Sequence, residues 1–372
     1  MKNYLHIILA SVLLLVLVSS IADAQVTFGT GKMNVRVGKY GEIRIFTTEG
    51  VDTVQHINRI SLIAAGNTGQ VIDYWSDLEV QIPTAPVASP VLSDYEISGT
   101  YNNAYSGLPP NFLIEQHLYG WSNQSYCLAK CVITNQETSE MPLLAGLDIV
   151  QYVDYTWEND HIFYDAVNQL LTQFDIHYVA IKILSEPTTS GQVFKWFDGY
   201  ELLDTLYYNM MYKGTFDTDT LLTDVDGGVG ILGGTPTTFQ PAATKTVYFA
   251  VSVGANRTEM LANMQLAQQK YNQLVSVESD FNNIPLDYVL EQNYPNPFNP
   301  STKISFGLPQ RSDVVLKVFN TLGQEVAVLV NESLEAGTHS YNFDASKLTS
   351  GIYVYSLQTE AGVISKKMTL IK

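Results

Sequence analysis

The sequence predicts an all-β protein in which a large N-terminal β-sandwich with one terminal helix precedes a smaller C-terminal β-sandwich. Short apolar runs with Gly, Asn or Pro between them recur along the chain, as in Met33–Val37 and Val247–Val253, which is typical of strands. Strands and helices do not alternate, which argues against a doubly wound fold. A proline-rich segment at 293–300 precedes the last set of strands, so we expect a separate domain there.

The chain begins with a predicted signal peptide at 1–24. Lys2 precedes an apolar run from Ile7 to Val18, and Ala22-Asp23-Ala24 offers the small residues of a cleavage site. A transmembrane anchor is the alternative, but the run is too short to cross about 30 Å of hydrocarbon. We therefore expect a mature chain from Gln25 that has left the cytoplasm and has no transmembrane segment.

Residues 25–283 are predicted to form the large sandwich, followed by a linker at 284–291. The helix is expected after Asn256, which can cap it with Glu259 three residues later. Apolar residues then recur at helical spacing, so they should form a stripe that packs on the sandwich. These residues are Met260, Met264, Ala267, Tyr271 and Leu274. Further strands are expected at 42–47, 113–119, 132–134 and 177–184.

The formal net charge of −17 lies on residues 25–288, because acidic and basic residues balance from Val289 onward and Lys2 cancels Asp23. Such an acidic surface repels phosphate backbones, so we expect no nucleic-acid partner.

The two cysteines, Cys127 and Cys131, lie in an apparent strand. Four residues along a strand separate them by about 13 Å, which is too far for a disulfide. We expect two buried free thiols and no structural zinc site.

The sequence lacks the common catalytic motifs, GxSxG, HExxH and GxxxxGK[ST]. Glu115 with His117, and Asp175 with His177, each place a carboxylate and an imidazole on one face of a strand. Such pairs suit acid–base catalysis or a metal site, although solvent-facing pairs are the commoner case. We therefore expect a non-catalytic domain more than an enzyme.

Aromatic residues gather in the central domain, and Trp157 is followed directly by polar and charged residues. Sugar rings need an aromatic face beside hydrogen-bonding groups, so we select a candidate ligand-binding set. Filling of the sandwich core is the alternative role for the tryptophans. The set is Trp157, Asp160, His161 and Trp196.

A candidate calcium site lies in two acidic segments. Carboxylate oxygens on a Gly-bent loop suit Ca²⁺, although the EF-hand series is incomplete and an acidic turn is the simpler alternative. We expect no other cofactor. The candidate ligands are Asp217, Asp219, Asp224 and Asp226.

Several segments of 25–283 loosely resemble the secreted galactose mutarotase-like β-sandwiches. The order runs from Ile133-Thr134-Asn135 through Leu147-Asp148-Ile149 and the Gly-rich Gly227–Gly234 to the Ala267…Tyr271 helix. This resemblance implies, as an alternative, a carbohydrate-active enzyme. It identifies no catalytic residues.

Residues 292–372 read as six or seven short strands, which predicts an Ig-like sandwich. The segment resembles the type A C-terminal sorting domain of the type IX secretion system, and its fold is similar to the Ig-like domain of flagellar hook-capping proteins. The residues that carry the resemblance are Asn293, Tyr294, Pro295, Asn296, Pro297, Phe298, Asn299, Pro300, Gly323, Gly351, Tyr353, Lys366 and Lys367.

This resemblance implies where the whole protein is exported. It implies recognition by an outer-membrane translocon, removal by a sorting peptidase, and attachment of the remainder to surface lipopolysaccharide. We expect a secreted or cell-surface protein that reaches its place through the periplasm and outer membrane. Its central domain is expected to be a binding or structural module, with polysaccharide as the favoured ligand. An adhesin-like or surface-layer protein is a further alternative.

Overall fold

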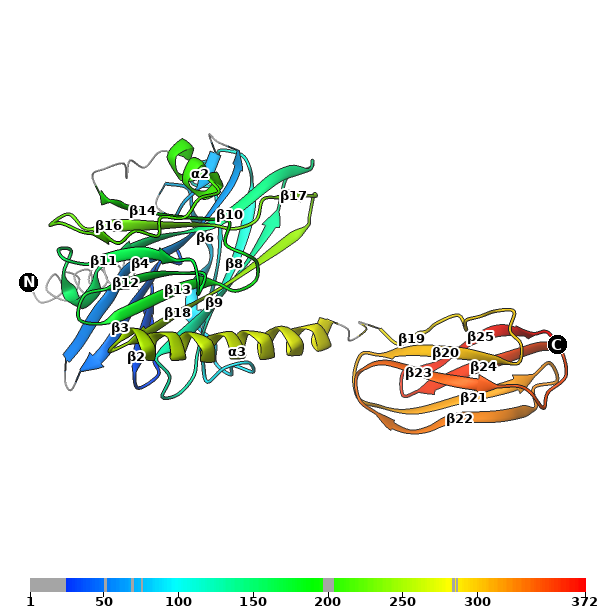
Figure 1. Cartoon of the computed structure of the whole chain (residues 1–372). Coiled ribbons are helices and arrows are strands. Elements are labelled where there is room, and N and C mark those ends of the chain that lie inside the picture. The colour runs from blue at the N-terminus through cyan, green and yellow to red at the C-terminus, as the bar shows by residue number, and fades with distance from the viewer. Residues whose placement is uncertain are drawn as a thin grey trace, which may run out of the picture. The chain divides into compact units, whose positions relative to one another are not determined.

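The computed structural model describes residues 25–49, 52–67, 70–74, 76–196, 204–282, 285 and 287–372. The predicted signal peptide lies outside the described residues. The chain divides into two compact units, the first ending at Tyr271 and the second beginning at Asn272 (Figure 1). The boundaries predicted from sequence, with a linker at 284–291, remain a prediction.

The first sheet of the first unit is antiparallel and has nine strands. Seven lie in the order β1-β2-β3-β4-β10-β16-β14, with β5 beside β4 and β17 beside β10. Their bounds are β1 (Val26–Gly29), β2 (Met33–Val37), β3 (Ile43–Glu49), β4 (Asp52–Asn67), β5 (Gln70–Ile72), β10 (Met141–Gln151), β14 (Ser190–Lys195), β16 (Gly228–Gly233) and β17 (Thr237–Phe239).

The second sheet also has nine antiparallel strands, in the order β15-β11-β12-β13-β18-β9-β8-β7-β6. Their bounds are β6 (Glu79–Pro86), β7 (Tyr95–Asn102), β8 (Phe112–Gly120), β9 (Tyr126–Asn135), β11 (His161–Asp165), β12 (Leu170–Phe174), β13 (Tyr178–Ile183), β15 (Leu221–Leu222) and β18 (Thr244–Gly254).

One hydrophobic core joins the two sheets. Ile45 and Leu147 come from the first sheet, while Ile133, Ile181 and Val251 come from the second, and all are buried in one cluster. Buried side chains alternate along strands such as β2 and β7, as expected for strands with one face on a core. The predicted large β-sandwich is confirmed.

Cys127 and Cys131 lie on β9, buried and free, as predicted. Both side chains belong to the core between the sheets, and burial raises the pKa of each thiol to about 12. A thiol in such surroundings remains protonated and inert.

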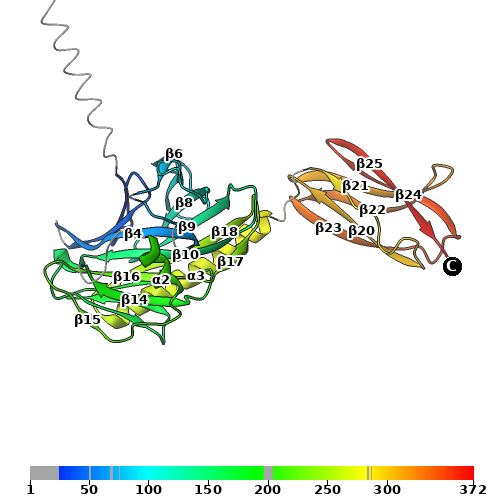
Figure 2. The same cartoon turned by 90° about the horizontal axis from the view of Figure 1, so that it is seen from above.

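The predicted terminal helix is α3 (Arg257–Asn282). Its amino end is capped as expected, because the Glu259 amide donates to Asn256 Oδ1 (3.0 Å). Met260 and Ala267 are buried, and Tyr271 packs edge-on against Tyr248 of β18, with ring centroids 5.1 Å apart. The helix therefore covers the outer face of the second sheet (Figures 1 and 2).

A second helix, α2 (Asp204–Tyr212), was not predicted. Tyr207 and Met211 are buried against the first sheet. The approach is close, because a Cβ added at Gly233 of β16 would lie 2.1 Å from the Met211 carbonyl oxygen. The predicted terminal helix is thus accompanied by a second, shorter helix. A short 3₁₀ turn, η1 (Val153–Tyr155), follows β10.

The second unit is a small sandwich, as predicted. One sheet holds β19 (Val289–Leu290), β20 (Ser301–Leu308) and β23 (Gly337–Asp344). The other sheet runs in the order β22-β21-β24-β25. Its strands are β21 (Ser312–Asn320), β22 (Glu325–Leu334), β24 (Gly351–Thr359) and β25 (Gly362–Leu370).

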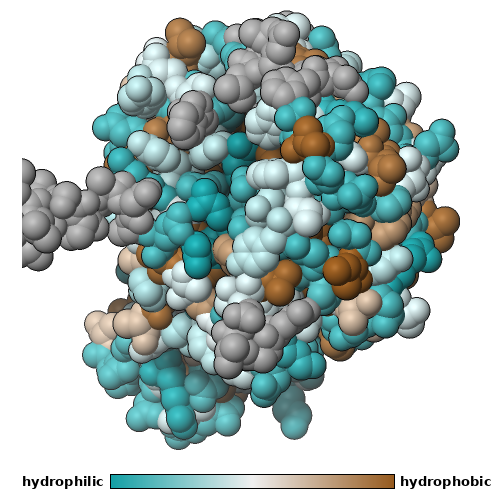
Figure 3. Space-filling view, turned by 90° about the vertical axis from the view of Figure 1, so that its left-hand side faces the viewer, coloured by the Kyte–Doolittle hydropathy of each residue, from teal (hydrophilic) through white to brown (hydrophobic). Residues whose placement is uncertain are grey.

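The surface of the first unit is polar where Figure 3 displays it. That face is mainly hydrophilic, with hydrophobic residues scattered over it (Figure 3). Within the described residues, neither helix has the length and apolar character needed to span a membrane.

Candidate functional site

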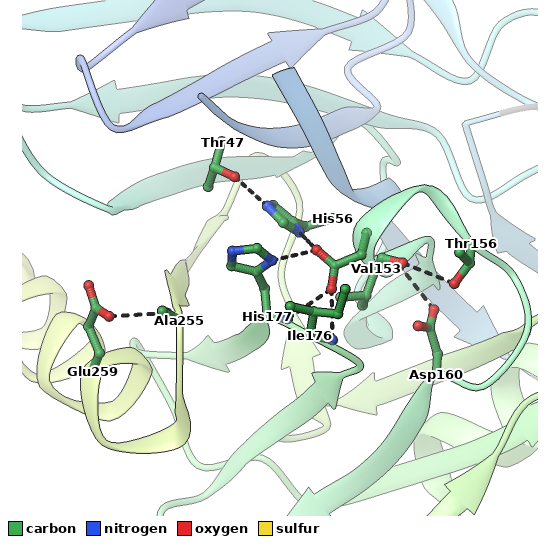
Figure 4. Close-up of polar contacts among 10 residues, drawn as sticks. Thr47, His56, Val153, Thr156, Asp160, Ile176, His177, Ala255 and Glu259 are labelled. Carbon is green, nitrogen blue, oxygen red and sulfur yellow. Dashed lines mark hydrogen bonds and ion pairs between the residues drawn. The ribbon is translucent and has the colours of Figure 1, made fainter. Parts of the chain in front are cut away.

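Three titratable side chains from separate segments meet in the first unit: His56, Asp154 and His177. One ligand atom from each lies within 4.8 Å of the others. Among the described residues, this is the group of three His, Cys, Asp or Glu side chains whose ligand atoms lie close enough together to hold one metal ion. Figure 4 shows the contacts around these residues, which we call the His–Asp–His cluster.

A β-bulge directs His56 into the cluster. On β3, Ile45 and Phe46 are consecutive, but their partners on β4 are Ile57 and Gln55, so His56 is the extra residue. A bulge of this kind turns a side chain away from the regular alternation, and bulges are common beside functional sites.

Asp154 is held in place by the backbone. It lies in η1 with φ 55° and ψ 33°, a left-handed conformation that costs energy for a residue with a side chain. Its Oδ2 accepts hydrogen bonds from the amides of Ile176 (2.9 Å) and His177 (2.8 Å). Its Oδ1 is thereby turned toward both imidazoles, 2.5 Å from His177 Nδ1 and 3.6 Å from His56 Nδ1.

The His56 side chain is fully buried. Its Nε2 lies 2.6 Å from Thr47 Oγ1, whereas Nδ1 has no hydrogen-bond partner among the described residues. Burial lowers the pKa of His56 to about 4; Asp154 opposes this effect and His177 adds to it. The imidazole is therefore neutral at neutral pH.

His177 connects the cluster to solvent. Its side chain is 17% exposed and lines an open cavity of about 170 Å³. The other lining residues are Thr47, Thr48, Ser125, Val253, Gly254, Ala255 and Glu259. A small ligand or ion can therefore reach the cluster without displacing the core.

Asp160, a predicted ligand-binding residue, is fully buried near the cluster. Its Oδ2 accepts a hydrogen bond from the Val153 amide (3.1 Å), and Oδ1 has no partner among the described residues. The pKa of Asp160 is raised to about 8, mainly by burial, and the charges of Asp175 and Asp154 act in the same direction. The carboxyl therefore retains its proton over much of the neutral range.

The other three predicted ligand-binding residues lie in packed surroundings. Trp157 is half-buried against Tyr152, with ring centroids 4.4 Å apart. Trp196 is half-buried on the hydrophobic cluster that α2 covers. His161 stacks on Phe174, with centroids 4.5 Å apart.

One aromatic residue beside Trp157 faces solvent. Tyr155 is 46% exposed and meets Tyr152 edge-on at 6.0 Å. We call Tyr152, Tyr155 and Trp157 the aromatic ledge. It follows β10 directly and includes the neighbour of Asp154, so it borders the His–Asp–His cluster.

The four aspartates of the predicted calcium site do not form a group of the kind found at the His–Asp–His cluster, as far as the chain is described. Asp217 Oδ2 accepts a hydrogen bond from the Val193 amide (3.0 Å). Asp224 lies 3.0 Å from Lys195 Nζ, and this pair lowers the pKa of Asp224. Asp219 is exposed. Calcium binding there stays a prediction, as does the expectation of no other cofactor.

The predicted carboxylate–imidazole pairs are replaced by others. His117 Nδ1 lies 2.8 Å from Glu96 of β7, so its carboxylate partner comes from the neighbouring strand. His177 pairs with Asp154 instead of Asp175. Sequence reasoning missed His56 and Asp154 as site residues, because their partners come from distant segments and no local spacing marks them.

The predicted sorting residues form an ordered opening of the second unit. Asn293 and Phe298 are buried, and the Asn293 amide donates to the Tyr355 hydroxyl (2.8 Å). The Phe298 amide donates to the Thr369 carbonyl (2.9 Å), which ties the opening to β25. The remaining residues of the opening are exposed: Tyr294, Pro295, Asn296, Pro297, Asn299 and Pro300.

Four of the other predicted sorting residues lie in the last two strands. Gly351 and Tyr353 belong to β24, and the Tyr353 hydroxyl donates to the Thr349 carbonyl (2.8 Å). Lys366 and Lys367 belong to β25. Gly323 has φ +78°, so the turn before β22 uses the freedom of a residue without Cβ.

A family model decides the identity of the second unit. The model described as "Secretion system C-terminal sorting domain" matches residues 292–372. These residues are a type IX secretion system sorting domain. The predicted limits agree with the match. A sorting domain implies that the chain is secreted.

The chain has distant structural neighbours. A bacterial glucoamylase complexed with acarbose shares 12% identity over 71% of this chain and 39% of its own, with a TM-score of 0.47. An aldose epimerase homologue from C. elegans shares 6% sequence identity, and the match covers 63% of this chain and 99% of the homologue, with a TM-score of 0.41. A galactose mutarotase-like protein from Lactobacillus casei shares 9% sequence identity, and the match covers 62% of this chain and 100% of that protein, with a TM-score of 0.38.

The predicted likeness to mutarotase-like sandwiches is thus present among the neighbours, but scores this low carry no argument about activity. The chain spans less than half the length of the glucoamylase. No curated protein matches the sequence.

Proposed function

We propose that this protein is a cell-surface carbohydrate-binding protein, exported through the outer membrane by way of its sorting domain. In this proposal the first unit is the working part and is not catalytic. The observation that carries the binding role is the aromatic ledge. There Tyr155 is 46% exposed and meets Tyr152, which packs in turn on Trp157.

The ledge has the composition that a sugar ring requires. The Tyr155 ring offers an apolar face for C–H contacts. Tyr152 meets it edge-on and packs in turn on Trp157. Glu158 and Asn159 are exposed beside it and offer hydrogen-bonding groups to hydroxyls at the ring edge. An exposed aromatic with such neighbours suits a polysaccharide that lies across the surface.

The export role is supported by the division of the sorting domain's opening into buried and exposed residues. Asn293 and Phe298 hold the opening against its own sandwich, while Tyr294 is 82% exposed. A translocon can read the exposed side chains without unfolding the domain. Removal of the domain by a sorting peptidase and attachment to lipopolysaccharide belong to the same proposal.

Binding to immobilised polysaccharides by a chain that begins at Gln25 tests the ligand. Tyr155→Ala should weaken binding about tenfold, the effect of losing about 1.4 kcal/mol. Tyr105→Ala is the matched control, because Tyr105 is 74% exposed outside the ledge. Equal binding by both variants, or no binding to any polysaccharide, would remove the carbohydrate proposal.

A carbohydrate-active enzyme is the second candidate, favoured by one observation. His177 lines the 170 Å³ cavity beside the Asp154 carboxylate, and such a pair can move a proton. Release of new reducing ends from a bound polysaccharide, lost in His177→Gln, would favour this candidate over a non-catalytic role.

A further inference from the structure

We propose that the His–Asp–His cluster is a binding site for a divalent transition metal, with Zn²⁺ as the metal it suits best. The ligands are one nitrogen each from His56 and His177 and Oδ1 of Asp154. This inference does not depend on the carbohydrate proposal, because it concerns only what the three side chains bind.

The donor set selects the metal. Two imidazole nitrogens and one carboxylate oxygen suit zinc, which binds His and Asp at about 2.0–2.2 Å. Hard cations such as Ca²⁺ and Mg²⁺ prefer oxygen ligands alone. The cluster therefore differs in chemistry from the aspartate segments at 217–226.

The spacing of the ligand atoms fits a metal after small movements. Ligands of a tetrahedral zinc lie about 3.3 Å apart, given bonds of about 2.05 Å. Asp154 Oδ1 is 3.6 Å from His56 Nδ1 and 2.5 Å from His177 Nδ1. The first separation is slightly long and the second is short, and the two imidazole nitrogens lie within 4.8 Å of each other. Shifts of up to about 1.5 Å therefore bring all three atoms to this spacing.

Each ligand already has the supporting contacts of a metal site. Thr47 Oγ1 holds His56 Nε2 at 2.6 Å, which leaves the other ring nitrogen to face the carboxylate. The amides of Ile176 and His177 hold Asp154 Oδ2, which leaves Oδ1 for the metal. Such outer contacts fix the orientation of metal ligands.

The strongest sign of a missing ligand is His56 Nδ1. This atom is buried in a side chain with no exposed surface, and it has no hydrogen-bond partner among the described residues. A buried polar atom without a partner is costly. A metal between His56 Nδ1 and Asp154 Oδ1 would satisfy it.

The cavity supplies access and a fourth position. His177 lines it, so a hydrated ion can enter from solvent and retain a water as the remaining ligand. Three protein ligands with one open position are the arrangement of zinc sites that bind a further ligand.

Metal titration of a chain that begins at Gln25 tests the proposal. After treatment with a chelator and its removal, the protein should bind Zn²⁺ at one equivalent per chain by calorimetry and by elemental analysis. Co²⁺ should give the visible absorption of a four-coordinate site. His177→Gln and Asp154→Asn should weaken Zn²⁺ binding at least about 100-fold, and Thr47→Val about 10-fold to 100-fold.

His117→Gln is the matched control, because His117 forms a similar imidazole–carboxylate pair with Glu96 on the second sheet. It should bind Zn²⁺ like the parent. Circular dichroism in the presence of chelator must show that each variant has the parent's fold. No stoichiometric binding by the folded parent, or unchanged binding in both His177→Gln and Asp154→Asn, would overturn the proposal.

Discussion

At the scale of single residues, the first unit keeps unusual groups close to its surface turn η1. Asp154 adopts a left-handed backbone, His56 occupies a bulge, and Asp160 is a fully buried carboxyl. Each departs from what the local sequence prefers, and stability elsewhere in the sandwich must offset the cost. All three lie near His177, which lines the open cavity, so this end of the domain is the one we propose as functional.

The buried carboxyl of Asp160 makes stability depend on pH. Folding raises its pKa to about 8, whereas an unfolded Asp loses its proton near pH 3.9. The unfolded state therefore holds fewer protons between these values, and the free energy of unfolding should fall as pH rises from about 4 to about 8. One such group contributes at most about 1.4 kcal/mol per pH unit.

Asp160→Asn should remove this contribution. The free energy of unfolding of the variant should therefore increase relative to that of the parent as pH rises. Urea unfolding at a series of pH values, in buffer with chelator, measures the difference. Asp219→Asn, which changes an exposed carboxyl, is the control. The same pH dependence in Asp160→Asn as in the parent would contradict the assignment.

At the scale of elements, α3 shows how local signals and packing agree. Asn256 caps the helix through the Glu259 amide, and the Glu259 carboxylate accepts from the Ala255 amide (3.1 Å). The buried stripe then covers the outer face of the second sheet, where Ser252 Oγ donates to the Met260 carbonyl (3.0 Å). Cap, stripe and sheet all favour the same helix.

Asn256→Ala should lower the free energy of unfolding of the first unit by about 1 kcal/mol, because the Glu259 amide loses its acceptor. Tryptophan fluorescence follows this unit alone, since all four tryptophans precede residue 197. Asn256→Asp retains the acceptor and should stay close to the parent. A midpoint unchanged in Asn256→Ala would mean that the cap contributes nothing.

Strands and α3 could be predicted because their signals are local. The buried residues of β2 alternate, and those of β18 form a continuous run. In α3 the apolar residues recur at helical spacing over several turns. By contrast, α2 has only nine residues and is held by close packing on Gly233. The local sequence of α2 gives no sign of this packing.

The site was harder to predict because a sheet brings distant residues together. The sequence pairs His177 with its neighbour Asp175, but its carboxylate partner in the structure is Asp154. His56 gave no signal, because a bulge on β4 depends on the register with β3. The polar neighbours of Trp157 predict a ligand-binding ring, yet Trp157 is half-buried and Tyr155 is the exposed ring.

At the scale of the whole molecule, the candidate binding features and the sorting signal lie in different units. The first carries the negative charge, the tryptophans, the His–Asp–His cluster and the aromatic ledge. The second is a sorting domain with balanced charge and its own core. Because the sorting domain has its own core, its recognition does not require a change in the core of the first unit.

Localisation in a host with a type IX secretion system tests this division most directly. The full chain is compared with a chain that lacks Gln292–Lys372, and with Gln292–Lys372 fused to an unrelated periplasmic protein. We predict that the full chain and the fusion reach the cell surface or the medium, while the shortened chain accumulates in the periplasm. Surface display of the shortened chain at the level of the full chain would contradict the account.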